Sequence, residues 1–167
     1  QTPAGTEELT DTSVHTVFNR LNGKLLILGD PGSGKTMTLL TLARDLLHRA
    51  TADPAHPIPV VLNLSSWAQT QLPLADWITE ELNRVFQVPR RVSRQWVKDD
   101  ALLLLLDGLD EVDVTARGAC VQAINTYRQQ HGFVDLVVCS RTADYDLLDE
   151  QLLMNGAIVI QPLNREQ

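Results

Sequence analysis

The segment Gly29-Asp30-Pro31-Gly32-Ser33-Gly34-Lys35-Thr36 decides how the rest of this sequence is interpreted. It follows the short apolar run Lys24–Leu28 and precedes a stretch, 35–50, whose leucines recur at three- and four-residue spacing. The pattern G-x-x-x-x-G-K-[ST] between a strand and a helix predicts a loop that wraps a triphosphate, the Walker A motif. Its glycines let backbone N–H groups approach the phosphates, and the helix N-terminus adds the positive end of a dipole.

Individual residues of this loop have separate expected roles. Lys35 should reach the β- and γ-phosphates, and the Thr36 hydroxyl should bind a Mg²⁺ ion. The alternative is a glycine-rich turn without a ligand, which the placement between a strand and a helix disfavours. The residues expected to contact the nucleotide are Gly29, Asp30, Pro31, Gly32, Ser33, Gly34, Lys35, Thr36 and Met37.

A second motif begins with the leucine run Leu102–Leu106, which ends at Asp107. A strand that is apolar on both faces belongs in a sheet covered by helices on both sides. A carboxylate at the end of such a strand, downstream of a phosphate loop, indicates a Walker B motif. It is predicted to hold the Mg²⁺, through a water molecule. The metal ligands expected from the protein are therefore Thr36 and Asp107. An aspartate that merely caps the next turn is the alternative.

Asp107 also opens an acidic cluster, Asp107-Gly108-Leu109-Asp110-Glu111. Carboxylates this close together repel one another unless a cation lies nearby. One of Asp110 and Glu111 should orient or deprotonate the attacking water, and Asp110 is slightly favoured. A solvated acidic turn is the alternative interpretation.

A third motif, Cys139-Ser140-Arg141-Thr142, again follows an apolar run. The planar guanidinium of Arg141 suits paired hydrogen bonds to phosphate oxygens, so Arg141 is expected to detect the γ-phosphate. A surface salt bridge is the alternative. The expected catalytic residues are thus Asp110, Glu111 and Arg141.

Strand and helix patterns alternate along the whole chain. This alternation predicts an α/β fold, a three-layer sandwich with a five-stranded, mostly parallel sheet and helices on both faces. Ligands on such sheets bind at the carboxyl ends of the strands, where each motif lies. Pro59 favours an edge position for its strand. The expected strands are Lys24–Leu28, Ile58–Leu64, Leu102–Leu106, Val134–Cys139 and Ala157–Ile160.

The ends of the chain carry two further expectations. Residues 1–22 are expected to form a lead segment with a short helix, and residues 23–167 the core domain. The leucines Leu147, Leu148 and Leu152 suggest a helix after the fourth strand.

Composition excludes several classes of function. The formal net charge of -7 disfavours direct binding to nucleic acid or to anionic membranes. Cys120 and Cys139 have no metal-ligand spacing, so buried thiols in a reducing cytoplasm are expected. No apolar run is long enough to cross a bilayer.

Taken together, the motifs resemble the NACHT family of P-loop NTPases, which belongs to the signal-transducing (STAND) ATPases. The resemblance implies the strand order 5-1-4-3-2, binding of ATP or ADP with Mg²⁺, and a nucleotide-driven switch. It also implies a small residue after the Mg²⁺ aspartate, where Gly108 stands, and a sensor arginine, where Arg141 stands. The segments that carry the resemblance are Gly29–Thr36, Pro59–Trp67, Leu102–Val112, Val137–Tyr145 and Ile158–Gln167.

The leading hypothesis is an ATP-binding and slowly hydrolysing switch module. Its expected partners are flanking regulatory and effector domains, with oligomerisation in the ATP state. In this family a helical bundle and a winged helix usually follow the core, so the chain is interpreted as an excised core. A nucleotide-binding scaffold without significant hydrolysis is the main alternative, and a P-loop kinase is a weaker one. A GTPase is disfavoured because no Asn-Lys-x-Asp segment occurs.

Overall fold

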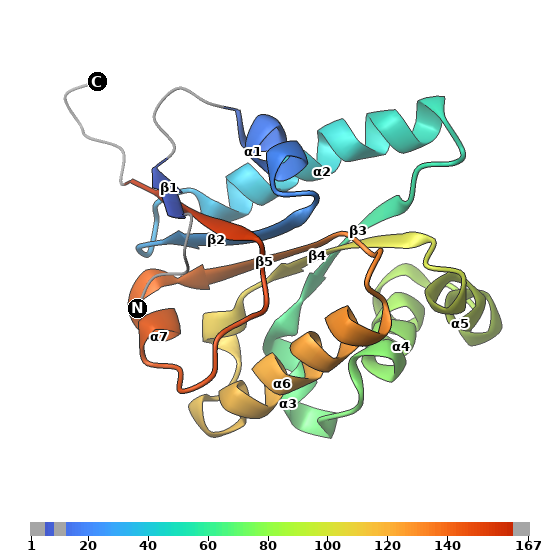
Figure 1. Cartoon of the computed structure of the whole chain (residues 1–167). Coiled ribbons are helices and arrows are strands. Elements are labelled where there is room, and N and C mark those ends of the chain that lie inside the picture. Colours follow the sequence, from blue (N-terminus) through green and yellow to red (C-terminus); the bar gives the residue numbers. More distant parts are fainter. Residues whose placement is uncertain (1–5, 9–12, 162–167) are drawn as a thin grey trace.

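The computed structural model describes residues 6–8 and 13–161, which form a three-layer α/β sandwich (Figure 1). Its sheet has the strand order β1-β6-β2-β5-β4-β3, and all the pairings are parallel. The strands are β1 (Thr6–Glu8), β2 (Lys24–Gly29), β3 (Ile58–Asn63), β4 (Leu102–Asp107), β5 (Leu136–Arg141) and β6 (Gly156–Ile160).

The predicted strand order is confirmed. Without β1, the sheet reads β6-β2-β5-β4-β3, which is the order 5-1-4-3-2 in the numbering of the five expected strands. Pro59 lies in β3, at the edge of the sheet, where its lack of an N–H removes no hydrogen bond between strands. The sequence does not predict β1, a short strand that pairs with β6 through Thr6 and Ala157.

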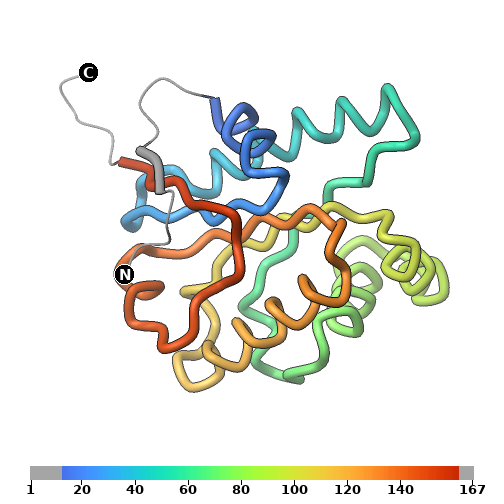
Figure 2. Tube along the Cα trace, in the orientation of Figure 1, coloured from blue at the N-terminus to red at the C-terminus, as the bar shows by residue number. Residues whose placement is uncertain are grey.

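Helices cover the two faces of the sheet unequally, as Figures 1 and 2 show. One face carries α1 (Val14–Arg20) and the long α2 (Lys35–Ala52), which share a core cluster with the sheet. The other face carries a larger cluster. Its helices are α3 (Trp67–Thr70), α4 (Leu74–Phe86), α5 (Arg90–Lys98), α6 (Val114–Gln130) and α7 (Thr142–Asp146).

The central strands bury side chains on both faces. In β2, Leu25 and Ile27 pack toward α1 and α2, whereas Leu26 and Leu28 pack in the cluster on the opposite face. All residues of β2 are buried. Because alternate side chains of a strand point to opposite faces, a strand buried on both faces has a continuous apolar run in its sequence.

Register brings the strand ends to one edge of the sheet. Gly29 is paired with Arg141 between β2 and β5, and Asn63 is paired with Asp107 between β3 and β4. The strands end slightly differently from the expected bounds: β3 stops at Asn63, and β5 extends to Arg141. The candidate site residues therefore lie at the carboxyl edge, where open α/β sheets bind ligands.

The predicted helix around Leu147–Leu152 is wrong. The helix after β5 is α7, which ends at Asp146, and residues 147–155 are not helical. This segment must return from the carboxyl end of β5 to the amino end of β6, which lies at the other end of the strands. An extended chain advances about 3.3 Å per residue but a helix only about 1.5 Å, so extended chain suits the return. The Tyr145 hydroxyl holds it by accepting the Leu152 N–H at 3.0 Å.

Both cysteines are free, and both are buried. Burial raises the pKa of the Cys120 thiol to about 12 and raises that of Cys139 as well, so both thiols are inert packing groups. Among the described residues, no helix has the length and apolar character required to span a membrane.

Candidate nucleotide site

The phosphate loop connects β2 to α2. Gly32 and Gly34 have φ angles of +76° and +96°, a left-handed conformation that glycine adopts without strain. Gly34 is the N-cap of α2 and provides no side-chain cap. The first N–H groups of α2 have no partner within the helix and are the donors that an anion at a helix N-terminus accepts from.

The floor of the loop contains a hydroxyl without a partner. Ser33 is buried, and its Oγ has no hydrogen-bond partner among the described residues. A Cβ added at Gly29 would collide with this Oγ, so a larger residue there would displace the Ser33 hydroxyl. Buried polar atoms in proteins are nearly always paired. The unpaired hydroxyl therefore fits a cradle shaped for an oxygen ligand.

Lys35 folds back over the loop that precedes it. Its Nζ donates hydrogen bonds to the carbonyl oxygens of Gly29 and Asp30, each at 3.0 Å. Asp30 and Pro31 are exposed, so the loop mouth is open to solvent. Met37 lies in the first turn of α2 with a side chain that is 67% exposed.

Thr36 and Asp107 meet across the edge of the sheet. The Thr36 Oγ1 hydroxyl donates to Asp107 Oδ2 at 3.1 Å, although the two residues are 71 positions apart. Octahedral Mg²⁺ with bonds of 2.0–2.1 Å places adjacent ligand oxygens about 2.9 Å apart. This oxygen pair therefore has the spacing of two neighbouring Mg²⁺ ligands.

The electrostatics of Asp107 also fit a cation. Burial raises the pKa of its carboxyl, and the nearby charges of Glu111 and Asp110 act in the same direction. Hydrogen bonds from Thr36 and Gly108 oppose the shift. A raised pKa means that the ionised carboxylate is unfavourable here without a compensating positive charge.

This shift predicts that Asp107→Asn stabilises the protein in the absence of Mg²⁺. The folded chain holds the Asp107 proton more tightly than the unfolded chain, so ionisation costs stability above the folded pKa. The variant should melt at a higher temperature than wild type at pH 7. The difference should shrink as the pH falls from the raised pKa of Asp107 toward about 3.9, the ordinary aspartate pKa, and should vanish below that value. A variant less stable than wild type at pH 7 would contradict this account of the site.

The two acidic residues after Gly108 have different partners. Asp110 accepts the backbone N–H of Arg141 at 3.1 Å, and its other oxygen lies 3.3 Å from Arg141 Nε. Glu111 is exposed and accepts a hydrogen bond from Asn63 Nδ2 at 3.0 Å. Both oxygens of Asp110 are thus engaged by Arg141. Glu111 Oε1 has no hydrogen-bond partner in the part of the chain that the structure describes.

Comparison with known proteins agrees with this geometry. The family model for the NACHT domain matches residues 24–166, which is most of the chain. The chain belongs to the NACHT family. It is therefore a P-loop NTPase domain, and the predicted recognition of the family is confirmed. No curated protein matches this sequence.

Solved structures of low sequence identity also match this chain, and the first of the two below shows the same fold. PCH-2 from C. elegans matches with a TM-score of 0.52 and 21% identity over 90% of this chain. The Pif1 helicase from Candida albicans matches with a TM-score of 0.48 and 14% identity over 94% of this chain. The NACHT domain spans only 38% and 41% of the lengths of those two chains.

Two residues of the NACHT domain site were not predicted from the sequence. Arg117, in α6, donates from Nη2 to the carbonyl oxygens of Asp110 and Val112, at 2.7 and 3.1 Å. Its Nη1 lies 3.4 Å from an Asp144 carboxylate oxygen, so Arg117 ties the acidic segment to α7. The sequence offered one hint of its role, because Arg117 is a positively charged residue on the apolar face of a predicted helix. The second residue is Asn63, a polar residue that ends an apolar strand.

Gly108 separates Asp107 from the acidic pair, and Gly108→Ala should reduce the stability of the protein. Its φ is +78°, and an added Cβ would lie 2.8 Å from Glu111 Oε2. We expect a loss of about 1–2 kcal/mol from the left-handed backbone alone, measured by chemical denaturation. Gly118→Ala is the matched control. Gly118 lies inside α6 with open space around it, so this change should stabilise by about 1 kcal/mol. Equal effects of the two changes would contradict the prediction.

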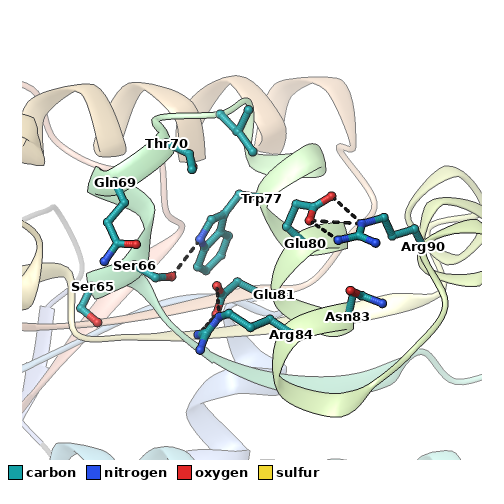
Figure 3. Close-up of a pocket in the computed structure, with 11 residues that line it drawn as sticks. Ser65, Ser66, Gln69, Thr70, Trp77, Glu80, Glu81, Asn83, Arg84 and Arg90 are labelled. Carbon is teal, nitrogen blue, oxygen red and sulfur yellow. Dashed lines mark hydrogen bonds and ion pairs between the residues drawn. The ribbon is translucent and has the colours of Figure 1, made fainter.

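A cavity of about 660 Å³ lies beside the NACHT domain site, between α3, α4 and the turn η1 (Leu64–Ser66) (Figure 3). Its charges are paired with one another: Arg90 with Glu80 at 3.0 Å, and Arg84 with Glu81 at 2.8 Å. None of the residues predicted to contact phosphate or Mg²⁺ lines it. The phosphate loop lies outside this cavity and is partly exposed, so this cavity is not the predicted triphosphate site.

Proposed function

We propose that this NACHT domain is the ATP-binding and slowly hydrolysing switch module of a signal-transducing ATPase. One observation carries the proposal: the Thr36 hydroxyl at the start of α2 meets the Asp107 carboxylate at the end of β4, at 3.1 Å. This contact joins the phosphate loop to the acidic cluster at a spacing that suits Mg²⁺. The nucleotide state would control neighbouring domains of the protein.

Binding begins at the loop. The N–H groups of Gly32 to Thr36 and the Lys35 ammonium would bind the β- and γ-phosphates, with Lys35 exchanging its loop carbonyls for phosphate oxygens. Thr36 and Asp107 would hold the Mg²⁺, which supplies charge neutralisation and Lewis acidity to the phosphates when bound.

Hydrolysis needs a carboxylate that can accept a proton from water. Glu111 is the better candidate because it is exposed and keeps one carboxylate oxygen unpaired among the described residues. Asp110 is only 10% exposed and is engaged by Arg141 through both oxygens. Asp110 would therefore anchor Arg141, whose two terminal nitrogens remain for the γ-phosphate oxygens.

A switch follows if the γ-phosphate changes these contacts. ATP would engage Lys35, Arg141 and the metal together, whereas ADP lacks the group that Arg141 detects. Because Arg117 links the acidic segment to α7, a shift of Arg141 would be passed to the chain before β6. Flanking regulatory and effector domains, oligomerisation in the ATP state and a cytoplasmic location belong to this proposal.

A nucleotide scaffold without significant hydrolysis remains the second candidate. The observation that favours it is the Asp110–Arg141 ion pair, which makes Arg141 a structural residue of the acidic turn. In that case Arg141 would respond equally to ATP and ADP.

Hydrogen–deuterium exchange of the chain with Mg²⁺ and saturating ATP or ADP distinguishes the two candidates. The switch predicts similar protection of residues 29–36 by both nucleotides, but stronger protection of 109–111 and 141–146 by ATP. Identical exchange with ATP and ADP in both segments would contradict a switch that detects the γ-phosphate.

A further inference from the structure

Asn63 makes two hydrogen bonds whose directions fix its amide. Its Oδ1 accepts the backbone N–H of Ser65 at 2.8 Å, and its Nδ2 donates to Glu111 Oε2 at 3.0 Å. A backbone N–H can only donate, so the oxygen of the amide must face Ser65. The amide nitrogen therefore faces Glu111 and is its donor.

The contact is built into the edge of the sheet. Asn63 is the last residue of β3 and the register partner of Asp107, and it is also the N-cap of η1. A Cβ added at Gly108 would lie 2.8 Å from Glu111 Oε2 and 3.3 Å from Asn63 Nδ2. The amide and the carboxylate thus pack together over the Gly108 backbone, next to the predicted Mg²⁺ ligand.

The charges of the cluster favour such a donor. Glu111 stands among the carboxylates of Asp107 and Asp110, and like charges push a flexible side chain away. A hydrogen bond from a neutral amide holds the carboxylate without adding a competing positive charge. It occupies one oxygen, Oε2, and leaves Oε1 for another hydrogen bond.

We infer that Asn63 is a positioning residue for ATP hydrolysis, acting through Glu111. Its amide holds Oε2 and thereby directs Oε1 toward the attacking water, whose proton Glu111 accepts. This inference rests on the proposed function, because it assigns Asn63 a part in the hydrolysis proposed above.

Asn63→Asp is the informative variant. Aspartate has the same shape and is an equally good N-cap, so the bond from Ser65 is kept. The amide donor is replaced by a carboxylate that repels Glu111. Asn63→Ala is the matched comparison, because it removes both the cap and the donor.

The measurement is single-turnover hydrolysis of trace ATP with Mg²⁺ by excess full chain, with ATP affinity and melting temperature measured in parallel. Asn63→Asp should hydrolyse about 10- to 100-fold more slowly than wild type. Its melting temperature should stay closer to wild type than that of Asn63→Ala. If Asn63 served only as a cap, the order would reverse, with Asn63→Asp as active as wild type and Asn63→Ala impaired.

A double variant separates action through Glu111 from other effects. In a Glu111→Gln background, Asn63→Asp should cause no further loss of hydrolysis, and a further loss of tenfold or so would overturn the inference. Hydrolysis by wild type with a fully active Asn63→Asp variant would overturn only the role of Asn63. The absence of hydrolysis by wild type would overturn the proposed hydrolytic function, and this inference with it.

Discussion

Replacing Lys35 by alanine should weaken binding of ATP with Mg²⁺ by at least about 100-fold, the largest effect expected of any single change in the phosphate loop. The Lys35 ammonium is the cation of the loop itself, and it is held at the mouth by the carbonyl oxygens of Gly29 and Asp30. Its loss would remove the charge-assisted contact that we propose it makes to the phosphates. Fluorescence anisotropy of a labelled ATP analogue measures the change.

The fold should tolerate this substitution. Among the described residues the Lys35 ammonium makes only two hydrogen bonds, one of them to the exposed Asp30, so the circular dichroism spectrum and the melting temperature should stay close to wild type. Lys98→Ala is the matched control, because Lys98 is an exposed lysine at the end of α5. It should bind ATP normally. Unchanged affinity in Lys35→Ala would contradict the assignment of the loop.

Replacing Glu111 by glutamine should reduce single-turnover hydrolysis by at least about 100-fold while ATP binding is retained. The amide keeps the shape of the side chain but cannot accept a proton from water. The contacts proposed for Lys35 and Thr36 at the phosphates and the metal are not changed. Rapid quenching of a reaction with enzyme in excess over labelled ATP measures hydrolysis apart from product release.

Two further variants serve as a control and as a comparison for Glu111→Gln. Glu150→Gln, in the segment after α7, should hydrolyse ATP at the wild-type rate. Asp110→Asn should weaken the hold on Arg141 and reduce hydrolysis less than Glu111→Gln. If Asp110→Asn abolished hydrolysis and Glu111→Gln did not, Asp110 would be the carboxylate that activates water.

The parts of this site that could be predicted from the sequence are those encoded by neighbouring residues. The phosphate loop is continuous, and the leucine run Leu102–Leu106 indicates a strand that is buried on both faces. A parallel sheet then brings the strand ends to one edge, so the convergence of Thr36 and Asp107 follows from two local patterns.

The parts that could not be predicted depend on contacts between distant side chains. Asn63 and Glu111 are 48 positions apart, and no local pattern shows that a strand-ending asparagine meets the acidic turn. Arg117 shares this property, since its partners lie in the acidic segment and in α7. The prediction of a helix at Leu147–Leu152 was wrong for a related reason. The distance to β6, rather than the leucine spacing, decides the conformation there.

The role of Asp110 also depended on contacts that only the structure shows. In the sequence, Asp110 and Glu111 are adjacent carboxylates, and Asp110 is slightly favoured to act on the attacking water. In the fold, the short turn η2 (Leu109–Glu111) directs them to different neighbours, Arg141 and Asn63. Burial and pairing, rather than residue type, then separate an anchor from a candidate base.

Isothermal titration of the wild-type chain with ATP and with ADP, each in the presence of Mg²⁺, tests the central claim most directly. We predict one nucleotide bound per chain and a measurable difference in affinity between ATP and ADP, because only ATP carries the phosphate that Arg141 would contact. Binding of neither nucleotide by a folded wild-type chain would contradict the claim that the edge of this sheet forms a nucleotide site.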